Sequence, residues 1–295
     1  MSECKNILKK SRRILLFFFC LFIGCSRYGN GLEIFYSGNL SGIIEDCVCP
    51  SATEGTILNH YAFYKDSIGN NKNSFYISAG NLFAYSKNDK ENIIITDIYS
   101  LLGYDVITPG RNDFQFIEQM KGSAVSYNIK GAKKYHKIRK DGITVSITGM
   151  ADTAFNRLSG ESIIEHRTID ELSVFIKELK ALSDIVIFVS NLESSFEKEV
   201  FMKISEIDIF ISNTNRRSEA YTFGKRHLVS PGQFGESIGK LIFHKTEEGT
   251  IISNSFTKIT RRFFKDDPNM KSRTDDLRRK YGIELEEIDS MFLDR

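Results

Sequence analysis

Short apolar runs rich in β-branched and aromatic residues recur along the chain, each followed by a polar turn and, in most cases, a helical pattern. These runs span residues 32–36, 74–78, 105–108, 143–147, 184–189 and 208–211. Their short length and nearly continuous hydrophobicity predict strands that are buried on both faces. The alternation of strands and helices indicates an α/β sheet.

Helical patterns occupy the segments between the runs, at 53–67, 92–102, 168–182 and 195–204. The strongest of them opens with a capping box, Thr168-Ile-Asp-Glu171. Its apolar residues recur at helical spacing and form one stripe, made by Leu172, Phe175, Ile176, Leu179 and Leu182. We interpret this stripe as a core-facing surface and not as a cofactor site.

The pattern changes after Pro231. Two extended runs, 238–244 and 250–259, are joined at Glu247-Glu-Gly249 and predict a β-hairpin. The sequence from Asp266 onward is highly charged, and 270–281 and 284–292 predict surface helices broken at Gly282. We therefore expect a main domain over 32–262 and a charged helical extension over 263–295.

The first 24 residues predict a targeting segment that is not part of the fold. The basic stretch 9–13 precedes an apolar run of about ten residues, which is too short for a stable membrane span but suits a signal sequence. The run ends in Phe22-Ile-Gly-Cys25, which resembles the lipobox of bacterial lipoproteins. This resemblance implies cleavage before Cys25, acylation of its sulfur and anchoring in the bacterial cell envelope, with 25–31 as a tether. An uncleaved anchor and a plain secretory signal are the alternatives.

Composition adds two constraints. Residues 1–24 hold five of the 40 basic residues and one of the 38 acidic ones, so the remainder is slightly acidic. A nucleic-acid partner is not expected, because phosphate backbones require clustered Lys and Arg. Cys47 and Cys49 are the possible thiols left beyond Cys25, too few for a disulfide framework. We interpret them as a buried or strained local pair, with a disulfide and a redox or soft-metal role as alternatives.

The polar turns after the strands are the most informative feature, because ligand-binding and catalytic groups of open α/β sheets lie at such carboxyl ends. In chain order they read Ser37-Gly-Asn-Leu-Ser-Gly42, Ala79-Gly-Asn81, Gly110-Arg-Asn-Asp-Phe114, Ser190-Asn191, Ser212-Asn-Thr-Asn215 and Gly232-Gln-Phe-Gly235. Their order and spacing over about 32–245 resemble the calcineurin-like metallophosphoesterases, in particular the 5′-nucleotidase branch. The resemblance implies a four-layer α/β/β/α sandwich of two mixed sheets.

The same resemblance implies a two-metal centre, but nearly every position for it carries an unsuitable side chain. The ligand positions fall on Asn39, Ser41, Asn81, Arg111, Asn191, Asn213 and Asn215, with Thr214 as an alternative for one of the last two. The histidine that protonates a leaving group falls on Asn112, and the acid that orients it falls on Asp113. Two neighbouring divalent ions require carboxylates and imidazoles, whereas amides are neutral and Arg111 adds a positive charge. We therefore expect no cofactor and no active catalytic residue.

Three functions follow from this sequence. The favoured one is a membrane-anchored lipoprotein whose metallophosphoesterase-like domain has lost catalysis and serves a binding or structural role. The second is a divergent, active metal-dependent phosphoesterase or nucleotidase, which would bind Mn, Zn or Fe through Glu45, Asp46 or Asp113. The third is a surface lipoprotein that binds host or envelope proteins.

The polar turns themselves allow two interpretations. They can be ordinary loops with favourable turn residues, or they can line a cleft for a small polar or anionic ligand, with Arg111 as its charge partner. We expect Asp113 to pair with Arg111 or to cap a helix that begins near Phe114. The five histidines fall outside the turns, and we interpret most of them as surface or strand residues.

Overall fold

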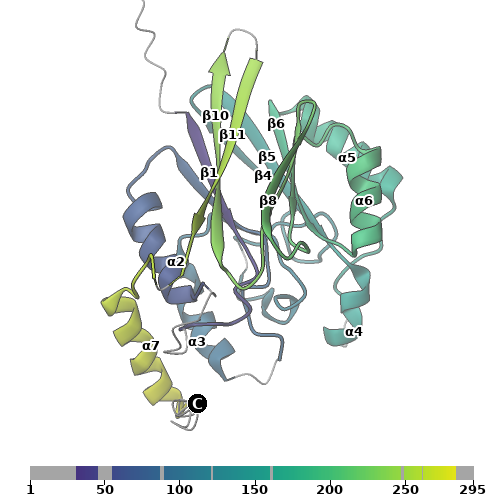
Figure 1. The fold of residues 1–295 in the computed structure, drawn as a ribbon. Coiled ribbons are helices and arrows are strands. Elements are labelled where there is room, and N and C mark those ends of the chain that lie inside the picture. The colour runs from purple at the N-terminus through teal and green to yellow at the C-terminus, as the bar shows by residue number, and fades with distance from the viewer. Residues whose placement is uncertain are drawn as a thin grey trace, which may run out of the picture. The chain divides into compact units, whose positions relative to one another are not determined.

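The computed structural model describes residues 31–45, 55–86, 90–120, 122–159, 162–246, 249–260 and 262–283. The predicted signal segment, Cys25, Cys47, Cys49 and the predicted helix at 284–292 lie outside these residues. Leu32–Arg295 group into one unit, in which two sheets lie face to face and helices cover their outer faces (Figure 1). Within the described part of the chain, no helix has the length and hydrophobicity needed to cross a membrane.

The first sheet contains, within the described residues, five strands in the order β11-β10-β1-β2-β3. Their bounds are Gly249–Lys258, Ser237–Thr246, Leu32–Ser37, Ser74–Ser78 and Val106–Ile107. β1, β2 and β3 run parallel, whereas β10 pairs antiparallel with both β1 and β11. The β10–β11 pair is the hairpin that the sequence predicts.

The second sheet contains, within the same described residues, six strands in the order β4-β5-β6-β7-β9-β8. Their bounds are His136–Lys140, Ile143–Ala151, Ile185–Asn191, Ile209–Ser212, Arg226–Pro231 and Ser218–Phe223. β5, β6, β7 and β9 run parallel, and the edge strands β4 and β8 are antiparallel to their neighbours. Both sheets are therefore mixed, which confirms the predicted fold class.

Alternating side chains divide the core into layers. On β6, Ile185, Ile187 and Val189 face the other sheet, whereas Val186 and Phe188 face the outer helices. The outer layer beside the second sheet is formed by α5 (Ile169–Ala181) and α6 (Ser194–Lys203), and that beside the first sheet by α2 (Ile57–Phe63), α3 (Glu91–Ile98) and α7 (Pro268–Tyr281). The layer order is helix, sheet, sheet, helix.

Most predicted elements form within a few residues of their expected bounds. The predicted helix at 53–67 begins later, after a capping box on Thr56, and α2 is followed by a π-helical turn at Tyr64–Ile68. The predicted helix at 92–102 is α3 followed by a 3₁₀ turn at Tyr99–Leu102. Short helical turns at Phe114–Phe116 and Thr153–Phe155, with α4 at Asn156–Ser159, complete the described helices.

Some predictions were wrong. Three strands, β4, β8 and β9, were not predicted. Their sequences are charged or polar, or their side chains are only partly buried. Leu182, assigned to the core-facing stripe, is 54% exposed because α5 ends at Ala181. α7 is not a plain surface helix, since it buries Met270, Thr274 and Arg278 against the body of the fold.

Candidate functional site

The polar turns of the two sheets meet at the carboxyl ends of the parallel strands. Asn39 and Asn81 follow β1 and β2 in the first sheet, and Asn191 and Asn213 lie at the ends of β6 and β7 in the second. Asn39 Nδ2 donates to the backbone carbonyl of Asn213 at 3.1 Å, which joins the two sheets. The predicted positions Asn39, Asn81, Asn112, Asn191 and Asn213 are thereby brought into one cluster, which we call the amide cluster.

Backbone groups fix how the amides of the first sheet point. Asn39 Nδ2 faces two carbonyl oxygens, of Asn213 and Gly232, so its Oδ1 is directed the other way and accepts from Asn81 Nδ2 at 2.8 Å. Asn81 Oδ1 in turn accepts the backbone N–H of Asn112 at 3.1 Å. Asn112 Nδ2 donates to the carbonyl of Phe83 at 3.0 Å. Each amide nitrogen in this row is thus held by an acceptor.

The same logic fixes the amides of the second sheet. Asn191 Nδ2 donates to the backbone carbonyls of Ala79 and Thr108, at 2.8 and 3.3 Å. Asn191 Oδ1 therefore accepts, and its donor is Asn213 Nδ2 at 2.8 Å. Asn213 is 4% exposed, and its Oδ1 is a buried acceptor without a hydrogen-bond partner among the described residues. Of the five side-chain amide oxygens in the amide cluster, those of Asn39, Asn81 and Asn191 accept N–H groups.

Close packing around two glycines leaves little room within the amide cluster. A Cβ atom at Gly110 would lie 2.6 Å from Asn81 Oδ1 and 2.9 Å from Asn191 Oδ1, and one at Gly38 would meet Asn213 Oδ1. Asn39 and Asn81 themselves adopt the left-handed backbone region, each with φ 56°. Asn tolerates that conformation better than most residues, so the turn geometry is compatible with these substitutions.

Asp113 supports the second turn rather than the roles predicted for it. Its carboxylate accepts four backbone N–H groups, from Asn81, Leu82, Phe83 and Gly110. It neither pairs with Arg111 nor caps the helical turn that begins at Phe114. Complete burial raises the pKa of Asp113 to about 6, although the four N–H donors oppose the rise. The expected pairing and capping are wrong because the side chain turns inward toward the Ala79–Phe83 segment.

Arg111 lies at the exposed rim of the amide cluster. Its guanidinium is 4.6 Å from the centroid of the Tyr85 ring and donates to the Tyr85 hydroxyl at 2.9 Å. Tyr85 is 56% exposed. The positively charged guanidinium thus faces solvent and lies over an aromatic ring. We call Arg111 and Tyr85 the rim pair.

The remaining predicted positions make few or no hydrogen bonds to the amide cluster. Ser41, with φ 50°, turns its hydroxyl to the backbone oxygen of Asn39 at 3.4 Å. Asn215 is half-buried, and within the described residues it makes no hydrogen bond to the other amides. Glu45, considered as a replacement ligand, is instead directed to Lys271 and Arg278 of α7. Asp46 lies outside the described residues.

Two titratable residues near the turns were not predicted, the buried His60 and the half-buried Glu197. His60 of α2 is 1% exposed, and its Nε2 donates to the carbonyl of Gly235 at 2.7 Å. Burial lowers the pKa of His60 to about 4, so the ring is neutral. Its position three residues after Ile57, on the apolar face of a predicted helix, was the available signal. The helix thus supports the Gly232–Gly235 turn, whose first carbonyl holds Asn39.

Glu197 of α6 is the second such residue. Its Oε1 accepts from Ser212 Oγ at 2.7 Å and from Thr214 Oγ1 at 3.2 Å, on both sides of Asn213. Burial raises the pKa of Glu197, and the hydroxyl donors limit the rise. The carboxylate therefore fixes the turn that carries Asn213, and no pattern in the sequence singled it out.

Comparisons with known proteins agree on the fold. No family model matches the chain, and no curated protein matches its sequence significantly. Solved structures do match: a Thermus thermophilus 5′-nucleotidase precursor (TM-score 0.70, 13% identity, covering 84% of this chain and 58% of that one) and the Bacillus subtilis calcineurin-like phosphoesterase YfkN (TM-score 0.64, 14% identity, covering 85% and 97%). This chain has the metallophosphoesterase fold. It spans 58% of the length of the Thermus 5′-nucleotidase.

A Staphylococcus aureus protein described as a 5′-nucleotidase gives the same picture, with a TM-score of 0.67 at 17% identity, and this chain again spans 58% of its length. Identities this low establish the fold alone. What the site does must therefore be argued from its own residues.

The metallophosphoesterase fold implies a dinuclear metal centre at these turns, and the side chains present do not fit one. Such a centre needs anionic oxygens and imidazole nitrogens. The amide cluster instead offers neutral oxygens, most of which already accept N–H groups, and NH₂ groups that repel cations. Within the described residues, no three His, Cys, Asp or Glu side chains gather to hold a metal ion.

Proposed function

We propose that this chain is a membrane-anchored binding protein built on a metallophosphoesterase fold, without metal-dependent hydrolysis. The observation that carries the proposal is the hydrogen bonding that already occupies Asn39, Asn81 and Asn191 in the amide cluster. Asn39, Asn81 and Asn191 donate to carbonyls or to one another, and their oxygens accept N–H groups in return. A divalent cation would have to displace these bonds without gaining a single anionic ligand from the cluster.

Metal content and hydrolysis test this part of the proposal together. Protein lacking residues 1–25 would be incubated with Mn²⁺, Zn²⁺ and Fe²⁺, freed of excess ions and measured by elemental analysis and by hydrolysis of bis(p-nitrophenyl) phosphate. We expect well under one metal per chain and no rate above the protein-free blank. Two equivalents of metal together with hydrolysis would establish the divergent phosphoesterase instead.

A gain-of-ligand variant is the matched control. Asn39→Asp/Asn81→Asp restores carboxylates at two positions where the resemblance implies them, without changing side-chain size. We expect this variant to retain more Mn²⁺ than the unchanged chain, because the missing anionic ligands are then partly supplied. If both proteins bind equally little, the neutral amides are not the reason for weak binding.

The rim pair is the binding element that we assign to the site. Arg111 presents charged N–H donors to solvent, and such donors suit the oxygens of a phosphate or carboxylate. The ring of Tyr85 beneath the guanidinium limits its conformations, which reduces the entropy lost on binding. A small anionic ligand is therefore the class of molecule that fits this rim.

The absence of Trp from the sequence allows a direct test of anion binding. Tyr85→Trp places a single tryptophan, whose emission can be excited selectively, under the Arg111 guanidinium, and the larger ring retains the cation–π contact. We expect inorganic phosphate to change its emission saturably, and we expect Arg111→Gln in the same background to abolish that change. Identical titrations with and without Arg111 would exclude the rim pair as an anion site.

Membrane anchoring through Cys25 is the remaining part of the proposal, and it is supported by the lipobox-like sequence. Metabolic labelling with a fatty acid in a bacterial host should label the unchanged chain and place it in the membrane fraction. Cys25→Ser should lose both label and membrane association. Protease treatment of intact cells would then show whether the domain is exposed, as a host-binding surface lipoprotein requires.

A further inference from the structure

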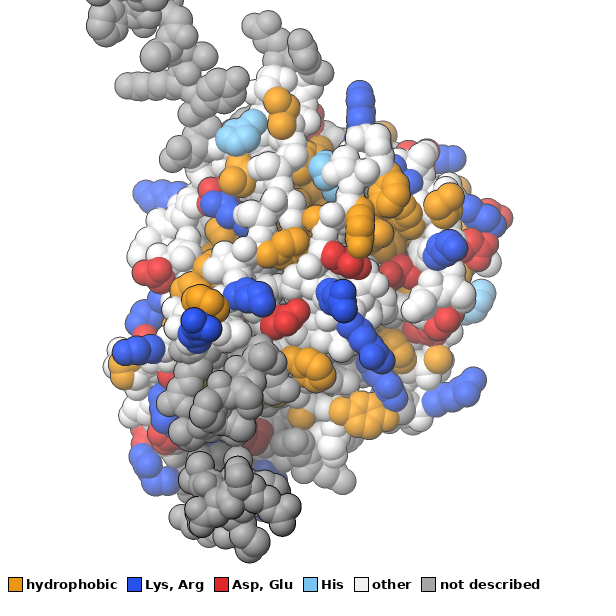
Figure 2. All heavy atoms as spheres, viewed as in Figure 1, with side chains coloured by type: hydrophobic (Ala, Val, Ile, Leu, Met, Phe, Trp, Pro, Cys, Tyr) orange, Lys and Arg blue, Asp and Glu red, His pale blue; other side chains and the backbone are white. Residues whose placement is uncertain are grey.

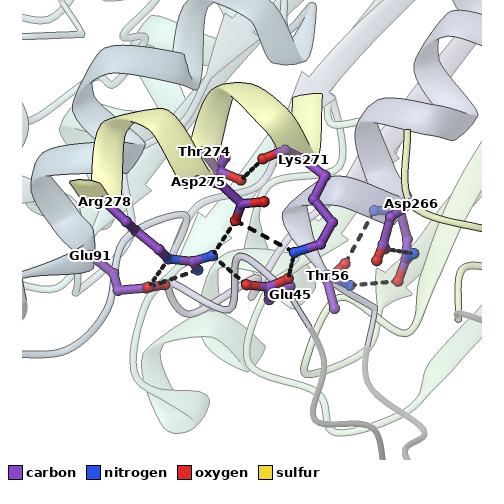
Figure 3. A network of polar contacts seen from close by, with 9 residues as sticks. Glu45, Thr56, Glu91, Asp266, Lys271, Thr274, Asp275 and Arg278 are labelled. Atoms are coloured by element: carbon purple, nitrogen blue, oxygen red, sulfur yellow. Dashed lines mark hydrogen bonds and ion pairs between the residues drawn. The ribbon is translucent and has the colours of Figure 1, made fainter. Parts of the chain in front are cut away.

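α7 is fastened to the domain by a network of charged side chains (Figure 3), none of which belongs to the amide cluster. Arg278 is at its centre, with a side chain that is only 5% exposed. Its guanidinium pairs with Glu45, with Glu91 at 2.8 Å and with Asp275 at 3.4 Å. Lys271, about two turns earlier on α7, binds the other oxygen of Glu45 at 2.6 Å. One buried guanidinium therefore ties α7 to two separate segments of the chain.

The first of these segments leads into the turn after β1. Ile43 and Ile44, just before Glu45, accept the backbone N–H groups of Ile57 and Leu58 at the start of α2. Four residues before Glu45, the Ser41 N–H donates to the Asn81 carbonyl at 2.7 Å, so this turn lies against the turn after β2. Burial alone would raise the pKa of Glu45, but Lys271 and Arg278 lower it below its usual value, so the carboxylate is ionised and held.

The second segment leads to Tyr85. Glu91 begins α3, and the next residue, Asn92, is buried. The Asn92 side chain accepts the backbone N–H of Ala84 at 2.8 Å and donates to the carbonyl of Ser86 at 2.8 Å. It thereby clamps the residues on both sides of Tyr85, half of the rim pair. Arg278 thus pairs with Glu91, and Glu91 directly precedes Asn92, whose side chain forms this clamp.

We propose that Arg278 is a positioning residue, through which α7 holds two loops beside the anion-binding site in place, the turn after β1 and the loop that carries Tyr85. The Glu45 arm fixes the turn that carries Asn39 and Ser41, and the Glu91 arm fixes the loop that carries Tyr85. Displacement of α7 would release both loops at once. The effect on anion affinity rests on the function proposed above, whereas the effect on the loops does not.

Hydrogen–deuterium exchange of the full chain tests the loops directly. In Arg278→Met we expect amides of 39–45 and 81–86 to exchange at least tenfold faster, while those of β6 keep their rate. Arg279→Met is the matched control, since Arg279 is the next residue on α7, is 73% exposed and pairs only with Asp276 among the described residues. Unchanged exchange in both loops, or an equal increase in β6, would overturn the proposal.

Two single-arm variants sharpen the result, and they replace Arg278→Met if that protein does not fold. Glu91→Gln should speed exchange in 81–86 much more than in 39–45, and Glu45→Gln should do the reverse. Equal effects on both loops from both variants would overturn the two-arm arrangement. Phosphate titration of the Tyr85→Trp reporter gives an independent result. If the reporter does not respond to phosphate in the otherwise unchanged chain, the proposed anion site is excluded. The exchange rates still decide the role of Arg278.

Discussion

The amide cluster is largely buried and the α7 network surrounds one buried arginine, but the polar groups of the two regions are satisfied in opposite ways. The amide cluster is neutral, and its side chains bind one another and the backbone carbonyls of the turns. The α7 network is built from full charges, with Arg278 between Glu45 and Glu91. The fold therefore keeps its buried ion pairs where they attach a helix, and it holds amides where a metallophosphoesterase fold implies metal ligands. The space-filling view in Figure 2 shows further charged side chains spread over one face of the molecule.

The charged region should be the more sensitive of the two to the loss of one side chain. Arg278→Met leaves Glu45 and Glu91 without their shared cation, and breaking such a buried pair costs about 3–5 kcal/mol. Urea denaturation should show this loss in the free energy of unfolding. Arg279→Met, on the exposed side of the same helix, should change it by less than about 1 kcal/mol. Similar losses for both variants would mean that the burial of Arg278 contributes nothing special.

The pH dependence of stability tests the neutral region through His60, the buried residue that supports the turn holding Asn39. An ordinary histidine in the unfolded chain has a pKa near 6.5, whereas burial lowers that of folded His60 to about 4. As the pH falls below 6.5, the unfolded state binds the proton first, so the stability present at neutral pH is lost toward pH 4. The advantage of the unchanged chain over His60→Gln should thus shrink by about 3 kcal/mol between pH 7 and pH 4.

The difference in stability between the unchanged chain and His60→Gln cancels the contribution of Asp113 to the pH dependence. That contribution has the opposite sign. Burial raises its folded pKa to about 6, so it favours the folded state as the pH falls through the same window. His166→Gln is the control for replacing a histidine by glutamine, because that side chain is exposed. A constant difference between the unchanged chain and His60→Gln would show that His60 is not buried as described.

Packing within the amide cluster should tolerate little added volume. In Gly110→Ala the new methyl group would meet Asn81 Oδ1, Asn191 Oδ1 and the Asn81 backbone nitrogen, all within 2.9 Å. Overpacking of this kind costs about 1–3 kcal/mol. Gly69→Ala is the control, since its φ is −58° and its nearest contact is 3.4 Å. Thermal unfolding that ranks the two variants equally would show that the cluster has room to relax.

The sequence predicted the fold because its central strands are continuous apolar runs. β2 and β6 are buried along their whole length, and such runs stand out in any sequence. The edge strands of the second sheet, β4 and β8, escaped detection for the opposite reason. β4 reads His136-Lys-Ile-Arg-Lys140 with a single buried residue, and β8 has no buried residue at all. Edge strands are commonly charged or polar, which removes the pattern that identifies them.

The candidate site was predictable only in part. The order of the turns placed Asn39, Asn81 and Asn191 near one another, but the direction of each amide depends on carbonyls from distant strands. Asp113 was misassigned because its donors are backbone N–H groups, which no side-chain pattern reveals. The burial of Arg278 was equally hidden, since a charged residue reads as exposed until its partners are known.

The rim pair gives the smallest expected change in stability and therefore the cleanest separation of binding from folding. Arg111 is exposed and contacts Tyr85, and exposed contacts of this kind contribute at most about 1 kcal/mol. Arg111→Gln should thus unfold in urea almost as the unchanged chain does, in contrast to Arg278→Met. If it lost about 3 kcal/mol or more, as a broken buried pair does, the guanidinium would belong to the structural network and the rim could not be a free anion site. If it kept its stability and lost the phosphate response of the Tyr85→Trp reporter, the two regions would divide the work as their burial indicates: the charged network holds the loops beside the site, and the exposed arginine of the rim pair binds.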